Sequence, residues 1–130
     1  MIHIKPYALH EGKKKGPSIK RVDVDGFLVM QGRDAESNDE LTFEIAQDED
    51  LWFHAKGVPG SHVVVRVDDR LPGDNVIRAA AQMAARNCRT KEGDVEVVYC
   101  KRKFVTKRPG MNPGQVAVDD RNSNKITVKI

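Results

Sequence analysis

Cysteine is scarce in this sequence: Cys88 and Cys100 are the only two among 130 residues. They lack the Cys-x-x-Cys spacing of a metal or redox motif, so we expect two reduced thiols rather than a disulfide or metal framework. Long apolar runs are also missing, because no stretch approaches the roughly 20 residues of a membrane span. The first residues show neither the apolar run nor the cleavage site of a secretory signal. We therefore expect a cytoplasmic protein without a membrane partner.

Aromatic residues make up only 5% of the chain, whereas 39% of residues are hydrophobic and 32% are charged. The apolar residues gather in short runs, which favours a folded α and β domain over disorder. A chain of this length supports one hydrophobic core. We expect one domain at 19–130, preceded at 1–18 by a basic arm that contains Lys13, Lys14 and Lys15. Such an arm either folds against a partner or stays flexible in solvent.

Charge is segregated along the chain, although the net charge is only +3. Residues 34–50 include eight acidic residues and no basic one, and residues 97–118 include five basic residues and no acidic one. The basic segment suggests a polyanionic partner. An alternative is that the two segments neutralise each other in the fold.

Turn residues and hydrophobic periodicity predict the order of the secondary structure. Asp25-Gly26 supplies the positive φ angles of a tight hairpin turn, and Ser37-x-x-Glu40 has the form of a helix capping box. The expected strands are 19–24, 27–30, 51–56, 61–67, 95–99 with an extension into the basic run, and a final pair of 115–118 with 125–130. The expected helices are 38–46 and the alanine-rich 76–88. This order predicts an α+β fold with a mixed, largely antiparallel sheet and two helices packed on one face.

The segment from Trp52 to Val65 is the most distinctive part of the chain. Its turn, Gly57-Val58-Pro59-Gly60, contains the Pro-Gly pair that favours a type II turn. An aromatic surface, hydrogen-bond donors and a cation around such a turn can stack a base or hold a phosphate. The candidates for this contact are Trp52, His54, Lys56, Ser61 and His62. The alternative is that the aromatic residues belong to the core.

Two histidines in one hairpin also suggest a metal site or a small enzyme, with Asp50 as a third group. A tight hairpin that aligns Lys56 with Ser61 places His54 and His62 on opposite faces, whereas a one-residue slip brings them together. The spacing matches none of the common zinc motifs. We therefore expect no metal, no cofactor and no catalytic residue, with the enzyme kept as an alternative.

The basic run after residue 100 is the second candidate for a contact with nucleic acid. Five cations within eight residues of an extended segment can neutralise several phosphates, and Phe104 lies between them. The predicted phosphate contacts are Lys101, Arg102, Lys103, Lys107 and Arg108. Arg86, on a basic face of the main helix, is a further candidate. A solubilising edge strand and a solvated helix face are the alternatives.

These motifs, taken in order, resemble the NFACT-R domain, the RNA-binding domain of NFACT proteins. The resemblance covers about 22–118 and rests most on the long segment from Asp50 to Val64. Arg33-Asp34 stands where the family commonly has Arg-Asn. The other matching motifs are Asp25-Gly26-Phe27, Gly32-Arg33-Asp34, Asn38-Asp39-x-Leu41, the alanine-rich helix before Arg86, the basic run, and Pro109-Gly110-x-x-Pro113-Gly114-Gln115-Val116.

The resemblance implies a module that binds tRNA or rRNA, and the absence of a catalytic constellation leads us to expect no chemistry. In large members this domain acts in ribosome-associated quality control, where those proteins engage the large ribosomal subunit and tRNA. At 130 residues we expect a small stand-alone member without their other domains. Two more hypotheses stay open: an RNA-presenting adaptor in tRNA modification such as thiolation, and a protein-interaction domain that uses the acidic segment 34–50.

Overall fold

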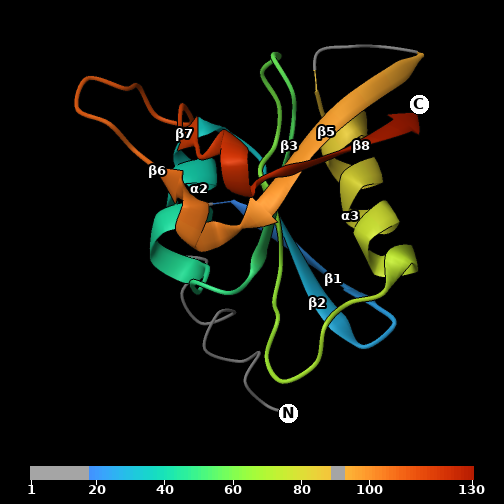
Figure 1. Cartoon of the computed structure of the whole chain (residues 1–130). Coiled ribbons are helices and arrows are strands. Elements are labelled where there is room, and N and C mark those ends of the chain that lie inside the picture. The colour runs from blue at the N-terminus through green and yellow to red at the C-terminus, as the bar shows by residue number, and fades with distance from the viewer. Residues whose placement is uncertain (1–17, 89–92) are drawn as a thin grey trace.

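The computed structural model describes residues 18–88 and 93–130, and a six-stranded sheet forms its centre (Figure 1). The strand order is β1-β2-β4-β3-β5-β8, with every neighbouring pair antiparallel. The strands are β1 (Ile19–Val24), β2 (Phe27–Gly32), β3 (Leu51–Ala55), β4 (Val63–Val65), β5 (Asp94–Lys101) and β8 (Asn124–Lys129). This arrangement confirms the predicted α+β fold. The predicted arm at 1–18 lies outside the described residues, except for Ser18.

The first hairpin forms as the sequence predicted. β1 pairs with β2 from Ile19 opposite Gly32 to Val24 opposite Phe27. Asp25 and Gly26 form the turn, with φ angles of 51° and 85°. A two-residue turn with positive φ angles at both positions is the type I′ turn, whose twist matches that of the flanking strands.

Helix α3 (Asp74–Arg86) covers one face of the sheet. Its buried side chains are small, namely Val76, Ala80, Ala81, Ala84 and Ala85. They belong to the same buried cluster as Val29, Phe53 and Val97 of the sheet. Alanine at these positions lets the helix lie close to the strands and favours the helix itself. Across residues 18–88 and 93–130, no helix has the length and apolar character needed to cross a bilayer.

Helix α2 (Ala35–Glu40) and the π-helical turn that follows it (Leu41–Ile45) lie on the opposite face (Figure 1). The expectation that both helices share one face was therefore wrong. The helix also begins three residues before the predicted start at 38, because Asp34 is the N-cap and accepts from Ser37 N at 2.7 Å. Asp34 and Ser37 both have N-cap chemistry, and the structure uses the earlier one.

The second hairpin has the register shifted by one residue from the tight hairpin, one of the two registers that the sequence left open. Trp52 pairs with Val64 and Phe53 with Val63, which does not align Lys56 with Ser61. The positive φ of the turn, 75°, falls on Gly57, and Gly60 is not in that region. Gly60 instead forms a bridge with Cys88 after α3, where an added Cβ would lie 3.0 Å from the Cys88 Cα. Close approach to the helix end, rather than a type II turn, therefore explains this glycine.

The carboxy-terminal strands pair differently from the prediction. A 3-10 turn (Arg102–Phe104) ends β5 and interrupts the basic run. Beyond it, β6 (Val105–Thr106) pairs with β7 (Ala117–Val118), and β8 joins β5 at the sheet edge. The expected pair of 115–118 with 125–130 was wrong, because alternation identifies a strand but does not identify its partner. Cys88 and Cys100 are not joined by a disulfide.

Candidate nucleic-acid interface

Trp52 and His62 lie in a buried polar network rather than on a surface. Trp52 is 1% exposed and His62 is fully buried. His62 Nδ1 lies 2.8 Å from Thr42 Oγ1, and Trp52 Nε1 donates to the same hydroxyl oxygen at 3.1 Å. His62 Nε2 lies 3.1 Å from the carbonyl oxygen of Gly114. Since that carbonyl oxygen can only accept, Nε2 carries the hydrogen and Nδ1 is the acceptor.

His54 and His62 lie on the same side of the hairpin, with ring centroids 5.1 Å apart. The sequence left open whether the two rings share a face, and the observed register, shifted by one residue from the tight hairpin, brings them together. Burial, followed by the charge of His54, lowers the pKa of His62 to about 3. Burial also lowers the pKa of His54. Both rings are therefore neutral at pH 7, and His62 fastens the hairpin to the loop that contains Gly114.

Asp50, the third group of the enzyme alternative, has a structural role. Its carboxylate is fully buried and accepts from Gln47 N at 2.8 Å, Arg66 Nε at 2.9 Å and Val67 N at 2.8 Å. These bonds join the chain before β3 to the chain after β4. Among the described residues, no group of three or more His, Cys, Asp and Glu side chains is placed to hold a metal ion.

The basic run contacts the acidic segment 34–50 inside the fold. Lys101 Nζ and Lys103 Nζ each lie 2.8 Å from a carboxylate oxygen of Glu49. Hydrogen bonds from these two lysines lower the pKa of Glu49 to about 2. Lys107 Nζ lies 3.0 Å from Asp39 Oδ1. Three of the five cations of the basic run therefore pair with carboxylates of the acidic segment 34–50. This is the mutual neutralisation that the sequence left open.

The other two cations of the run differ from each other. Arg102 Nε donates to the Thr42 carbonyl oxygen at 2.6 Å, and its guanidinium lies 5.2 Å from the centre of the Phe43 ring. Arg108 is exposed and has no ion pair within the part of the chain that the structure describes. Only Arg108 of this run therefore has a cation unengaged by the described residues.

The remaining predicted contacts lie apart from the basic run. Lys56 Nζ, just after β3, is 3.7 Å from Glu96 Oε1 on β5, and both side chains are well exposed. Arg86 is exposed in the last turn of α3. Ser61 is 8% exposed and precedes β4. The structure therefore divides the predicted residues among the core, an internal charge network and the end of α3.

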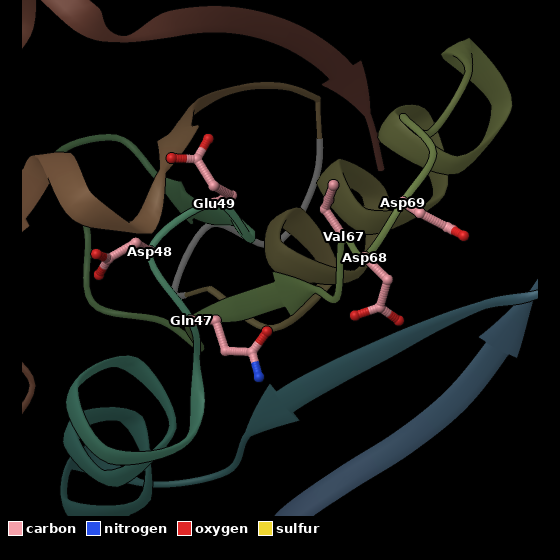
Figure 2. Close-up of a pocket in the computed structure, with 6 residues that line it drawn as sticks. All are labelled: Gln47, Asp48, Glu49, Val67, Asp68 and Asp69. Atoms are coloured by element: carbon pink, nitrogen blue, oxygen red, sulfur yellow. The ribbon is translucent and has the colours of Figure 1, made fainter.

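An acidic concavity of about 680 Å³ lies between the chain before β3 and the chain after β4. Its lining consists of Gln47, Asp48, Glu49, Val67, Asp68 and Asp69 (Figure 2). Figure 2 shows the carboxylates of Asp48, Glu49 and Asp69 pointing in different directions, so they do not converge on one point. This negative surface repels phosphate and is an unsuitable RNA contact.

A second concavity, of about 360 Å³, has the opposite character. Its lining is polar and basic and contains no carboxylate: Lys20, Gln31, Arg33, Ser61 and Asn87. Ser61 is the only one of these that the sequence predicted as a contact. Lys20 opposite Gln31 follows from the correctly predicted first hairpin, but no sequence signal linked that pair to Asn87, 56 residues further on.

Comparisons with known proteins agree with the resemblance seen in the sequence. The pattern that defines the family described as "NFACT protein RNA binding domain" matches residues 19–120. "Rqc2 homolog RqcH" of Streptococcus suis is 37% identical over 101 residues, which are 77% of this chain and 18% of that protein. The Bacillus subtilis protein of the same name is 35% identical over 103 residues, 78% of this chain and 18% of that protein. The chain thus spans about a fifth of the length of these relatives.

A solved structure has the same fold. The C-terminal part of the fibronectin/fibrinogen-binding protein of Streptococcus suis superimposes with a TM-score of 0.75 and 34% sequence identity. The match covers 91% of this chain and 46% of that one. A eukaryotic relative, the "Coiled-coil domain-containing protein 25 homolog" of Dictyostelium discoideum, is 28% identical over 97 residues, 69% of this chain and 46% of that protein.

Proposed function

Because this chain belongs to the family of NFACT protein RNA-binding domains, we propose that it binds tRNA or ribosomal RNA as a non-catalytic module. The observation that carries the proposal is the family match at 19–120, which encloses every predicted contact residue. Asp50 and His62 were candidates for catalysis, but their side-chain polar atoms form hydrogen bonds within the fold. This supports a binding role. Binding is therefore assigned to the basic surfaces rather than to a reactive centre.

We extend the proposal to ribosome-associated quality control in the cytoplasm, with the large ribosomal subunit as a partner. Support comes from the two bacterial relatives named "Rqc2 homolog RqcH". This chain matches only 18% of those proteins, so the activities of their other parts do not follow from the match. Co-sedimentation with purified large subunits, at two salt concentrations, tests this extension. Absence of the protein from the subunit fraction at low salt would contradict it.

Binding to tRNA is expected to weaken steeply as salt rises. If three phosphates are contacted, the Kd rises roughly 20–40-fold between about 50 and 200 mM monovalent salt, because each contact releases condensed counterions. Fluorescence anisotropy with labelled tRNA measures this slope, and a duplex DNA of equal length is the comparison. A protein that binds neither nucleic acid at low salt would overturn the proposed function. Equal binding of tRNA and duplex DNA would show that the protein binds nucleic acid without a preference for RNA.

We propose that lysines of the basic run exchange their ion pairs within the fold for contacts with RNA phosphates. The Lys101 and Glu49 side chains are 46% and 53% exposed, and ion pairs at such exposure contribute little to stability. A polyanion can therefore compete with Glu49 for Lys101 and Lys103. Lys101→Glu with Lys103→Glu is expected to weaken tRNA binding about tenfold or more.

Glu49→Gln is the matched variant, because it releases the same two lysines and also removes a negative charge. It is expected to strengthen tRNA binding about two- to threefold, because it removes one negative charge that repels the nearby RNA phosphates at the surface. Both variants are measured by the same anisotropy titration. If neither changes the Kd, the basic run is not part of the interface.

A further inference from the structure

We propose that the basic concavity lined by Lys20, Gln31, Arg33, Ser61 and Asn87 is a pocket for one phosphate group of RNA and its adjoining nucleotide. This inference rests on the proposed function and names the surface that carries it out. The lining includes Asn87 at the end of α3 and no residue of the basic run.

Four separate parts of the chain build the pocket. Lys20 lies directly opposite Gln31 in the β1–β2 register, so the two side chains share a face of the sheet. The chain at Arg33 is fixed because its backbone N donates to Ser37 Oγ at 3.0 Å and to the Ser18 carbonyl oxygen at 3.1 Å. Asn87, the C-cap of α3, donates from Nδ2 to the Met83 carbonyl oxygen at 2.8 Å. Rigid elements therefore hold the lining in place before any ligand arrives.

Two side chains in this lining are buried without a hydrogen-bond partner among the described residues. Gln31 is 4% exposed and Ser61 is 8% exposed, yet neither the Gln31 amide nor the Ser61 hydroxyl bonds to another described residue. No described side-chain polar atom is both unpaired and fully shielded, so these two groups open into the concavity that they line. Buried polar groups are nearly always satisfied in folded proteins. A ligand with acceptor oxygens would satisfy the Gln31 amide and the Ser61 hydroxyl together.

The charge of the pocket selects an anion. Lys20 and Arg33 are exposed, form no ion pair with a described carboxylate, and face no acidic residue in the lining. The carboxy-terminal end of α3 opposes an anion with about half a negative charge. Two full positive charges outweigh it, and Arg86, next to Asn87, adds a third nearby. Arginine suits phosphate because its planar fork donates two parallel hydrogen bonds.

The volume of the pocket limits what it can hold. About 360 Å³ lies at the lower end of the range of about 300–1,000 Å³ for small-ligand sites. One phosphate with its nucleotide fits such a space, whereas a duplex does not. Sequence-specific RNA recognition commonly uses bases splayed from loops and single-stranded ends. We therefore assign the pocket to an unpaired nucleotide of a structured RNA.

The test compares Lys20→Gln with Arg33→Gln against a control that loses the same charge elsewhere. The control is Arg121→Gln with Lys125→Gln, whose side chains are exposed and do not line the pocket. The protein is titrated into labelled tRNA at several salt concentrations. The pocket variant is expected to raise the Kd roughly 10–100-fold and to make the salt slope shallower by about two, whereas the control changes the Kd less than about threefold.

Ser61→Ala provides a variant without any change of charge. It removes one hydroxyl that is proposed to contact the phosphate, and we expect the Kd to rise about three- to tenfold. Urea unfolding of each variant, compared with the wild type, separates loss of contact from loss of fold. An unchanged Kd in both Ser61→Ala and the Lys20, Arg33 variant overturns the pocket.

The possible outcomes separate the pocket from the proposed function. If wild-type protein binds no tRNA, the proposed function fails and the pocket fails with it. If wild-type protein binds tRNA, while the Lys20, Arg33 variant binds as the control does and Ser61→Ala binds as the wild type does, only the pocket is overturned. A free nucleotide is the other source of the same chemistry, so adenosine monophosphate is titrated against the NMR signals of Gln31 and Ser61. Saturation at micromolar adenosine monophosphate, with no competition by tRNA, would overturn the assignment to RNA.

Discussion

Lowering the pH from 7 to 5 is expected to reduce the free energy of unfolding by about 2 kcal/mol through His62 alone. In the unfolded chain this histidine has its ordinary pKa of 6.5, whereas burial in the fold lowers its pKa to about 3. Below pH 6.5 the unfolded state therefore binds a proton that the folded state does not bind. Stability is complete above this pH and falls by about 1.4 kcal/mol per pH unit until about pH 3. Urea unfolding at pH 7, 6 and 5, at constant ionic strength, measures the loss.

His62→Asn is the control for this prediction. Asparagine does not titrate and cannot span from Thr42 to the Gly114 carbonyl oxygen as the imidazole does. The variant is expected to be less stable than the wild type at pH 7 but to lose about 2 kcal/mol less between pH 7 and 5. His54, whose pKa burial also lowers, keeps part of the pH dependence in the variant. An equal loss in both proteins would show that His62 is not the titrating group.

Asp50→Ala is expected to lower the free energy of unfolding by about 3–5 kcal/mol, the usual effect of removing one partner from a buried ion pair. Asp50 is fully buried, and its loss leaves Arg66 Nε and two backbone N–H groups without their acceptor. Thermal or urea unfolding measures the change. Binding of tRNA by the folded fraction should be unaffected, because no RNA contact is assigned to Asp50.

Asp48→Ala is the matched control because it removes the same charge from an exposed neighbour in the acidic concavity. We expect a change within about 0.5 kcal/mol, as for most surface substitutions. Equal destabilisation by the two variants would mean that Asp50 contributes only its charge. A stable Asp50→Ala that binds tRNA less well would instead give this carboxylate a functional role.

The sequence predicted local structure where a few residues determine the backbone. Asp25-Gly26 gave the first hairpin its turn and its register, because their φ angles are a property of the residues themselves. The alanine-rich run gave α3 to within two residues at either end. The start of α2 was misplaced because Asp34 and Ser37 compete for one cap position. Both side chains are suitable N-caps by their local chemistry, and the packing of the fold decides which of them is used.

The charges of one segment do not predict which ion pairs that segment forms in the fold. Residues 97–118 look like a polyanion-binding strand because no acidic residue interrupts them. In the fold, Glu49 lies against Lys101 and Lys103, and Asp39 against Lys107. These pairs join residues more than 50 positions apart, so no window of the sequence displays them. The proposed pocket was missed for the same reason, since Lys20 and Asn87 come together only through the packing of α3.

The family, the α+β class and the elements with local turns and periodicity follow from the amino-acid sequence. The fold was needed to establish that the two helices lie on opposite faces and that β8 pairs with β5. It also decided that Trp52 and His62 are core residues, and that Gln31 and Ser61 open into a basic concavity. The physical reason is that periodicity sets which side of its own strand a residue faces. Strand partners and register then decide which charges meet, and these depend on contacts between distant segments.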